Sequence, residues 1–328
     1  MDLREQACWL LLVYESGLTS RIVNCIIRTW CKQLGRSLQD FFEVDTQEWQ
    51  KVPELKPEMM QKLEQAKEKR LAQGFLVERL DNEQIRMVTV LHPDYPALLK
   101  NALDLTHIPP ILFVKGDLQL LDRRTIAIIG SRKASTTSLD FTKATAQMLA
   151  QHGTNIISGN ARGVDRTAYE GATSVAEGHT TVVLPHGIGR LSKVQIRDLQ
   201  PRIEAGNVLL ISQFHPDAQW VVSRAMERNN VVTGLAQVVI VAESDTKGGT
   251  WEGAKNALKH KRLVYVRQSD DTSLPGNEAL IQQGGLPLAW PVDNIEAALR
   301  PILKKSGAIQ QKQQERLTPA EQQSLFAS

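Results

Sequence analysis

The stretch IAIIGSRKASTTS, Ile126 to Ser138, decides the fold class of this 328-residue chain. Four apolar residues run into Gly130, and a serine, an arginine and a lysine follow before a series of small hydroxyl residues. An apolar strand that ends at a glycine and opens a helix is typical of α/β proteins, which bind ligands at the carboxyl ends of their strands. The turn lacks the dinucleotide fingerprint G-x-G-x-x-G, so the sequence predicts a phosphate-binding turn of another kind.

The same alternation of strand and helix continues toward the C-terminus. A first strand at 110–116 leads into this region, and six strand–helix units follow. The predicted strands are 125–130, 155–159, 180–185, 207–212, 237–243 and 262–268, and the helices that follow them lie near 136–152, 163–177, 192–205, 219–229, 250–260 and 276–283. Because the strands are β-branched and nearly all apolar, both faces of the sheet must be covered. The sequence therefore predicts an α/β fold with a Rossmann-like, doubly wound, mostly parallel sheet.

The chain before this region has a different pattern. Apolar residues recur at helical spacing over 5–14, 19–34, 36–43 and 57–73. Four prolines between Val88 and Gly116 then interrupt any helix, and we place the domain boundary near residues 90–110. We expect a helical N-terminal domain over 1–85, a Rossmann-like domain over 86–300 and a polar, loosely ordered tail over 301–328. That tail is too short for a full winged helix, but Thr318-Pro319 could begin one short helix.

Composition sets outer limits on function. Apolar residues make up 42% of the chain, charged residues 23%, and the formal charge is +3, which permits a nucleic-acid partner without requiring one. The chain has three cysteines, Cys8, Cys25 and Cys31. Because none of them has C-x-x-C spacing, they argue against a disulfide framework or a zinc site. The apolar run at 7–14 is too short to span a bilayer. We therefore expect a cytoplasmic protein without membrane partner, metal or cofactor.

Two predicted loops follow consecutive strands and carry glycine, serine and arginine. Residues 130–133 can donate hydrogen bonds and a guanidinium fork to a phosphate, although a plain helix cap with Arg132 in solvent explains that loop equally well. Residues 158–165 place backbone N–H groups at a helix start, where anions bind. Asp165 falls in the first helical turn, which favours a carboxylate, and could also hold Arg132 or Arg162. Consecutive parallel strands usually neighbour one another, so we expect one cationic site.

Two further loops are predicted at the same edge. Residues 226–235 would direct Arg228 and Asn229 toward it, and the glycine-rich residues 248–254 precede a helix. Single strands are held by cationic grooves and by stacking on aromatic residues. The expected groove cations are Arg132, Lys133, Arg162, Arg166 and Arg228. Aromatic residues are scarce, and those near the loops are more often core or surface residues than base platforms: Tyr169, Trp220 and Trp251.

Four segments in order resemble the DNA-processing protein A family (DprA, also called Smf). They are TIAIIGSRKAS, IISGNARGVDRTAYEGA, TTVVLPHGI and RNNVVTGLAQVVIVAES. The segment HPDYPALLKNALDLTHIPPILFVKGD resembles the entry into that family's Rossmann-like domain, and the helical N-terminus resembles its sterile-alpha-motif-like domain. The resemblance covers roughly residues 5–290 and is specific, because four motifs agree in order and spacing.

The resemblance implies a homodimeric, cytoplasmic protein that binds single-stranded DNA, protects incoming strands during natural transformation (competence) and helps to load the recombinase RecA. It implies a DNA-binding pocket lined by Gly130, Ser131, Arg132, Ser158, Gly159, Ala161, Gly163, Asp165, Arg228 and Asn229. We add Lys133 and Arg162 as further cations of the same loops. Because the sequence shows no triad or metal cluster, we expect a binding protein rather than an enzyme.

The sequence departs from the family at Asn230, where the motif has a third residue that is cationic. The Gly248–Glu252 loop also resembles the Gly-Gly-x-Gly-Thr-x-Glu loop of LOG-type nucleotide phosphoribohydrolases. In that alternative, Glu252 would assist cleavage of the glycosidic bond of a nucleoside monophosphate. A pocket that senses a phosphorylated nucleotide without catalysis is a third hypothesis.

Overall fold

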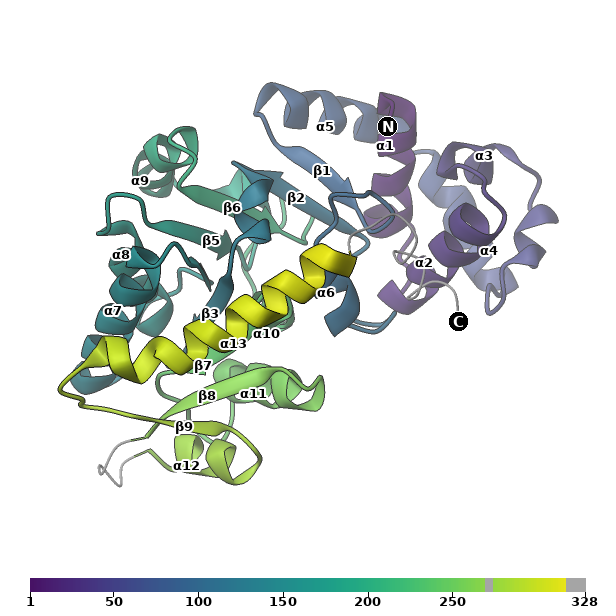
Figure 1. The fold of residues 1–328 in the computed structure, drawn as a ribbon. Coiled ribbons are helices and arrows are strands. Elements are labelled where there is room, and N and C mark those ends of the chain that lie inside the picture. Colours follow the sequence, from purple (N-terminus) through teal and green to yellow (C-terminus); the bar gives the residue numbers. More distant parts are fainter. Residues whose placement is uncertain (269–273, 317–328) are drawn as a thin grey trace. The chain divides into compact units, whose positions relative to one another are not determined.

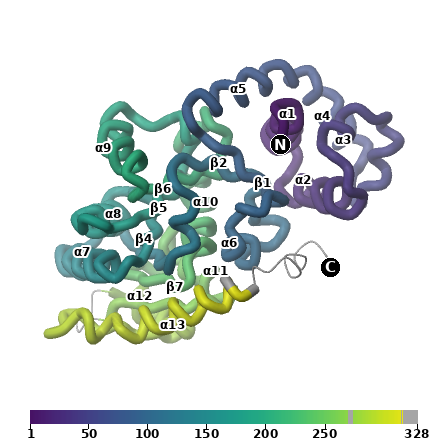
Figure 2. The backbone as a smooth tube through the Cα atoms, turned by 45° about the horizontal axis from the view of Figure 1, so that its top comes forward, coloured from purple at the N-terminus to yellow at the C-terminus, as the bar shows by residue number. Residues whose placement is uncertain are grey.

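The structure is a computed structural model that describes residues 1–268 and 274–316 (Figures 1 and 2). The chain divides into two compact units. The first unit holds residues 1–95 and 103–114, and the second holds residues 96–102 together with the described chain from residue 115 onward.

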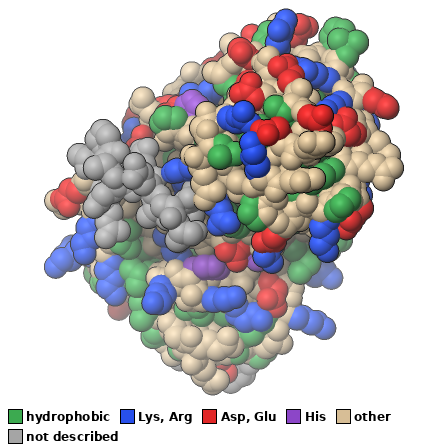
Figure 3. Space-filling view, turned by 90° about the vertical axis from the view of Figure 1, so that its right-hand side faces the viewer, with side chains coloured by type: hydrophobic (Ala, Val, Ile, Leu, Met, Phe, Trp, Pro, Cys, Tyr) green, Lys and Arg blue, Asp and Glu red, His purple; other side chains and the backbone are tan. Residues whose placement is uncertain are grey.

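The surface carries both signs of charge. On the face drawn in Figure 3, Lys and Arg side chains are interspersed with Asp and Glu side chains. Hydrophobic side chains occur there in small separate groups. Within residues 1–268 and 274–316, no helix is both long enough and apolar enough to cross a membrane.

Helices make up most of the first unit. They are α1 (Leu3–Leu10), α2 (Ser20–Ile26), α3 (Leu38–Glu43), α4 (Pro57–Lys67) and α5 (Arg70–Asn82). Wider π-helical turns, Leu11–Glu15 and Ile27–Gln33, extend α1 and α2. The single helix predicted over 57–73 was wrong, because the chain turns at residues 68–69 and a second helix, α5, begins at Arg70. Strand β1 (Arg86–Thr89), which the sequence analysis missed, pairs antiparallel with β2 (Ile111–Lys115).

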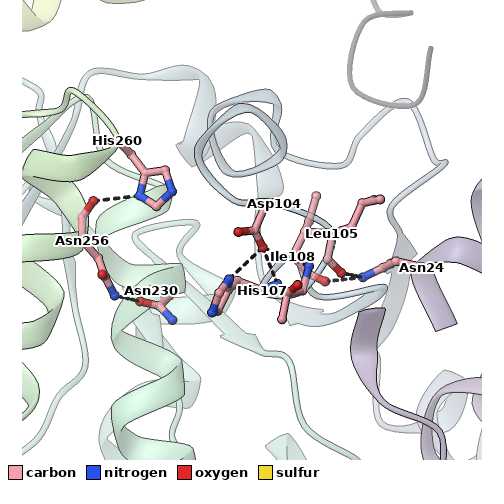
Figure 4. Close-up of polar contacts among 9 residues, drawn as sticks. Asn24, Asp104, Leu105, His107, Ile108, Asn230, Asn256 and His260 are labelled. Atoms are coloured by element: carbon pink, nitrogen blue, oxygen red, sulfur yellow. Dashed lines mark hydrogen bonds and ion pairs between the residues drawn. The ribbon is translucent and has the colours of Figure 1, made fainter. Parts of the chain in front are cut away.

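Aromatic packing and one buried amide hold the first unit together. The rings of Trp30 and Trp49 are fully buried on either side of Phe41, with ring centroids 5.2 Å and 5.1 Å away. The buried Asn24 of α2 donates from Nδ2 to the carbonyl oxygens of Leu105 and Ile108, at 2.8 Å and 3.0 Å (Figure 4). Because buried polar groups cost free energy unless they are bonded, this amide fixes the chain at 105–108 against α2.

In the described chain, the second unit contains seven parallel strands. In spatial order they are β6 (Val208–Ser212), β5 (His179–Val183), β4 (Asn155–Ser158), β3 (Thr125–Ile129), β7 (Val238–Val241), β8 (Leu263–Gln268) and β9 (Leu286–Ala289). The six strands predicted from 125 to 268 are confirmed. Two short elements were not predicted: β9, which contains Pro287, and helix α6 (Ala97–Ala102), which follows Pro96. Proline argues against regular structure at both places.

Helices cover the strands of the second unit. They are α7 (Thr136–Gln151), α8 (Val164–Thr173), α9 (Lys193–Glu204), α10 (Val222–Gly234), α11 (Gly249–Lys259), α12 (Pro275–Gln282) and α13 (Ile295–Arg316). Helices α7 and α8 lie side by side (Figures 1 and 2) and pack with α13 over Ile126 and Ile128 of β3. Ala127, between them, is also buried and points to the opposite face, so the sheet is covered on both sides.

The predicted loose tail is wrong for residues 301–316, which belong to α13. Leu299 and Ile302 are buried in the core cluster, and Gln310 donates to the carbonyl oxygen of Asp122 at 2.7 Å. An apolar stripe at helical spacing thus outweighs the glutamine-rich composition of this segment. The short helix expected at Thr318-Pro319 lies outside the described residues.

Candidate nucleic-acid interface

The loops after β3 and β4 meet at one edge of the sheet, as predicted. The two strands are parallel neighbours, with Ile126 opposite Ile156. The N–H of Val164, at the start of α8, donates to the Ser131 carbonyl oxygen at 3.3 Å. Gly163 has φ +87°, and a β-carbon there would overlap the backbone of Ser131. Only glycine permits so close an approach of the two loops.

The loop after β3 is anchored by Glu243, which lies just beyond the end of the neighbouring strand β7. Ser131 donates its N–H to the Glu243 carbonyl oxygen at 2.9 Å, and the Glu243 carboxylate accepts from the N–H and Oγ of Ser135 at 2.9 Å and 2.8 Å. The same carboxylate accepts from Ser138 Oγ at 2.6 Å. These bonds fix both ends of the segment that carries Arg132 and leave that arginine exposed.

Arg132 lines each of three pockets in the described chain, with volumes of about 410, 280 and 540 Å³. The largest number of predicted residues lies around the 410 Å³ pocket, which sits between the loops after β3 and β7. Strand order reverses between β3 and β7, so this is the crevice where open α/β sheets bind ligands. Lys133 and Lys247 line the same pocket, and both are exposed.

The structure gathers nearly all of the predicted site residues around these pockets. The 410 Å³ pocket is lined by Gly130, Ser131, Arg132, Lys133, Ala161, Asp165, Arg228 and Asn229. Gly159 and Arg162 line the 280 Å³ pocket, and Gly163 and Arg162 line the 540 Å³ pocket. Ser158 is fully buried instead, and its Oγ donates to the Asp165 carbonyl oxygen at 3.2 Å.

Arg228 is not the exposed loop cation that the sequence predicts. The predicted loop at 226–235 is mostly the interior of α10, and the Arg228 side chain is only 3% exposed. Its Nη1 donates to the Val183 carbonyl oxygen, and its Nη2 lies 3.7 Å from Asp165 Oδ2. The asparagines of this segment favour a loop by local propensity, but burial of Val231 and Val232 stabilises the helix. Arg228 is therefore an internal ion-pair partner more than a surface cation.

Asp165 organises the loop after β4. The backbone N–H groups of Gly159 and Ala161 favour its charged form, and its ion-pair partner is Arg228 instead of the predicted Arg132 or Arg162. Burial raises the pKa of this carboxyl, while the Arg228 charge opposes that rise. The Asp165 carboxylate, which is 13% exposed, thus ties the start of α8 to Arg228 of α10.

Asn230, which replaces the motif's third cation, does not line any of the three pockets that Arg132 shares. Its Oδ1 accepts from Asn256 Nδ2 of α11 at 3.0 Å, and His260 Nδ1 lies 2.7 Å from the Asn256 carbonyl oxygen (Figure 4). The adjacent Asn229 approaches α11 closely as well, since a β-carbon on Gly249 would lie 2.7 Å from its Nδ2. These asparagines join α10 to α11, a role that a cation at position 230 would not fill.

Other candidates from the sequence fall into two groups. Arg166 is held by Glu170 and Asp198, at 2.8 Å and 3.0 Å, and so is partly neutralised. Tyr169 and Trp251 are buried, whereas Trp220 is 46% exposed with the Arg132 guanidinium 5.6 Å from its ring centroid. Lys247 was not predicted as a site residue, although its position directly before Gly248-Gly249 was a usable indication. Within the described chain, no group of three or more His, Cys, Asp or Glu could hold a metal ion.

A mostly parallel sheet with helices on both faces and cationic loops at the carboxyl ends of its central strands defines a Rossmann-like α/β protein. The family described as DNA recombination-mediator protein A matches residues 86–299, and the chain belongs to this family.

Known relatives agree with this assignment. The chain is 30% identical over 194 residues to Smf of Escherichia coli, which covers 58% of this chain and 51% of Smf. It is 28% identical over 214 residues to DNA processing protein DprA of Bacillus subtilis, which covers 64% of this chain and 70% of the relative. The chain thus spans about half the length of Smf.

Two solved structures have folds similar to that of this chain. DNA processing protein A of Streptococcus pneumoniae matches with a TM-score of 0.68 and 22% identity, over 92% of this chain and 98% of the other. The protein of the same name from Helicobacter pylori, described for its single-stranded DNA binding mode, matches with a TM-score of 0.56 and 27% identity. That match covers 67% of this chain and 96% of the other.

Proposed function

We propose that this chain binds single-stranded DNA through the loops 130–133 and 158–165. The observation that carries the proposal is the position of Arg132, which is exposed and lines three adjoining pockets. Lys133, Arg162 and Lys247 are exposed around the same pockets. The cations extend over several pockets. They therefore suit a nucleic-acid backbone, which carries a negative charge at each nucleotide, better than they suit a single small phosphate.

Helix geometry strengthens the same site. α8 and α11 begin at the sheet edge with Gly163 and Gly248 as N-caps. Their first N–H groups and dipoles favour anions, in addition to the cationic side chains. Contacts to the sugar–phosphate backbone carry little sequence information, so we expect weak sequence preference and a steep dependence on salt.

Family membership supports the finer parts of the proposal. The relatives are named for DNA processing, and the Helicobacter pylori protein is described for its single-stranded DNA binding mode. We propose the same ligand here, bound by a cytoplasmic homodimer that protects incoming strands during DNA uptake and helps to load RecA.

The hydrolase alternative receives no support from the geometry. Glu252 does not line any of the three pockets that Arg132 shares, and its carboxylate pairs with Lys255 of the same helix at 3.1 Å. A carboxylate that acts on a glycosidic bond has to reach the reacting sugar.

Fluorescence anisotropy of a labelled poly-dT strand and a matched duplex, across a salt series, tests the proposal. We expect tighter binding of the single strand and a steep loss of affinity with salt. Arg132→Ala should weaken binding and reduce the slope of log K against log salt by about 0.7 for each lost phosphate contact. Arg300→Ala is the matched control, since Arg300 is 76% exposed and lines none of these pockets. Equal affinity and slope in both variants would overturn the assignment.

A further inference from the structure

Trp220 is an exposed aromatic residue beside the phosphate-binding loops. The residue is 46% exposed and lines the 280 Å³ pocket together with Arg132 and Arg162. The other five tryptophans, all within the described residues, are buried or half-buried at positions 9, 30, 49, 251 and 290. A large apolar ring left in solvent costs free energy, so its exposure at this pocket requires a reason.

The chain holds Trp220 on a fixed segment. Gly187 donates its N–H to the Ala218 carbonyl oxygen at 2.9 Å, and Arg224 donates from Nη1 to the Gln219 carbonyl oxygen at 2.6 Å. Trp220 follows directly, at the start of the chain that enters α10. An anchored backbone and a cation–π partner in Arg132 reduce the entropy that the ring would lose on binding a ligand.

The 280 Å³ pocket has the composition of a site for a planar heterocycle. Leu184 and Pro185 contribute apolar surface to its lining. The side chains of Asn160, His186 and Gln195, which also line it, offer hydrogen-bond donors and acceptors. Pockets that are mainly apolar with a few polar groups and an aromatic wall are typical of small-molecule and base recognition.

We propose that Trp220 is a stacking platform for one nucleobase of the bound strand, and that this base enters the 280 Å³ pocket while its phosphate lies against Arg132. This inference rests on the proposed function and adds to it a subsite for the base. Bases of a single strand are free to stack on a protein ring, whereas those of a duplex are paired and stacked on one another. Trp220 would therefore contribute to the preference for single strands, while Arg132 attracts any phosphate backbone.

Intrinsic fluorescence gives a direct test. Because Trp220 is the most exposed of the six tryptophans, we expect unlabelled dT oligonucleotide to quench the emission of the wild-type chain, and expect Trp220→Phe to lose most of that quenching. Trp220→Leu, which keeps apolar bulk without an aromatic ring, should bind dT roughly 5- to 150-fold more weakly, while Trp220→Phe should stay near wild type. Urea unfolding of each variant checks that it is folded.

An abasic oligonucleotide of equal length separates base stacking from phosphate contact. We expect Trp220→Leu to bind it as well as the wild-type chain does, because no base is available to either. Three outcomes would overturn the inference: unchanged emission on binding dT, equal dT affinity of Trp220→Leu and wild type, or an equal loss on the abasic strand. Each of these outcomes is compatible with the proposed function, provided that dT still binds and that Arg132→Ala still weakens the binding of dT. Failure of the wild-type chain to bind dT overturns both.

Discussion

The Arg228 guanidinium packs directly against the Cα atom of Gly159, so that a β-carbon on Gly159 would overlap it. The same guanidinium donates to the Val183 carbonyl oxygen and pairs with Asp165. A glycine in β4's loop and an arginine in α10, far apart in sequence, therefore form one packing unit beneath the predicted DNA site.

Replacement of Gly159 by alanine should destabilise the protein. The added methyl group has to displace a buried guanidinium, and overpacking of this kind costs about 1–3 kcal/mol. Urea unfolding of Gly159→Ala measures the loss. Gly74→Ala in α5 is the matched control, since nothing lies within 4 Å of its β-carbon position and it should stabilise the helix by about 1 kcal/mol. Equal stability of Gly159→Ala and wild type would contradict the packing described here.

Removal of the Asp165 carboxylate should leave a buried charge without its partner. We expect Asp165→Ala to lower the free energy of unfolding by about 3 kcal/mol, because Arg228 is 3% exposed and cannot turn to water. A double-mutant cycle with Arg228→Ala measures the interaction. The double variant should lose less than the sum of the two single variants, and strict additivity would show that the pair is not coupled.

Glu243 should affect the proposed DNA site without contacting DNA itself. Its carboxylate accepts from Ser135 and Ser138, so Glu243→Ala releases the start of α7 and costs about 1–3 kcal/mol. We expect faster amide hydrogen exchange at Ser135 and weaker DNA binding with an unchanged salt slope, since no phosphate contact is lost. A reduced slope would instead indicate a changed set of phosphate contacts.

His179 should make stability depend on pH. Burial, together with the nearby Arg123, lowers the pKa of this imidazole below its ordinary 6.5. Below about pH 6.5 the unfolded chain therefore binds a proton that the folded chain does not. The free energy of unfolding should fall as pH decreases from 6.5 toward the depressed pKa, by at most about 1.4 kcal/mol per pH unit. Urea titrations of wild type and His179→Gln at pH 7.5, 6 and 5 should show a shallower decline in the variant.

Much of the second unit could be predicted from local pattern. The buried strand at 125–129 is rich in β-branched residues, the strand at 155–158 is centred on Ile156 and Ile157, and the glycine that follows each marks its end. The segment at 226–235 could not be assigned in this way. Its asparagines favour a loop locally, and the packing of Val231 and Val232 makes it a helix.

By itself, the sequence determined the alternation of strands and helices, the edge where the loops after β3 and β4 meet, and the residues that those loops carry. These follow from side-chain periodicity and from the rule that parallel strands present their carboxyl ends together. Only the tertiary structure decided which cations face solvent. Arg132 is exposed while Arg228 is buried against Gly159 and Asp165. Exposure depends on contacts between residues distant in sequence, which periodicity within one segment does not encode.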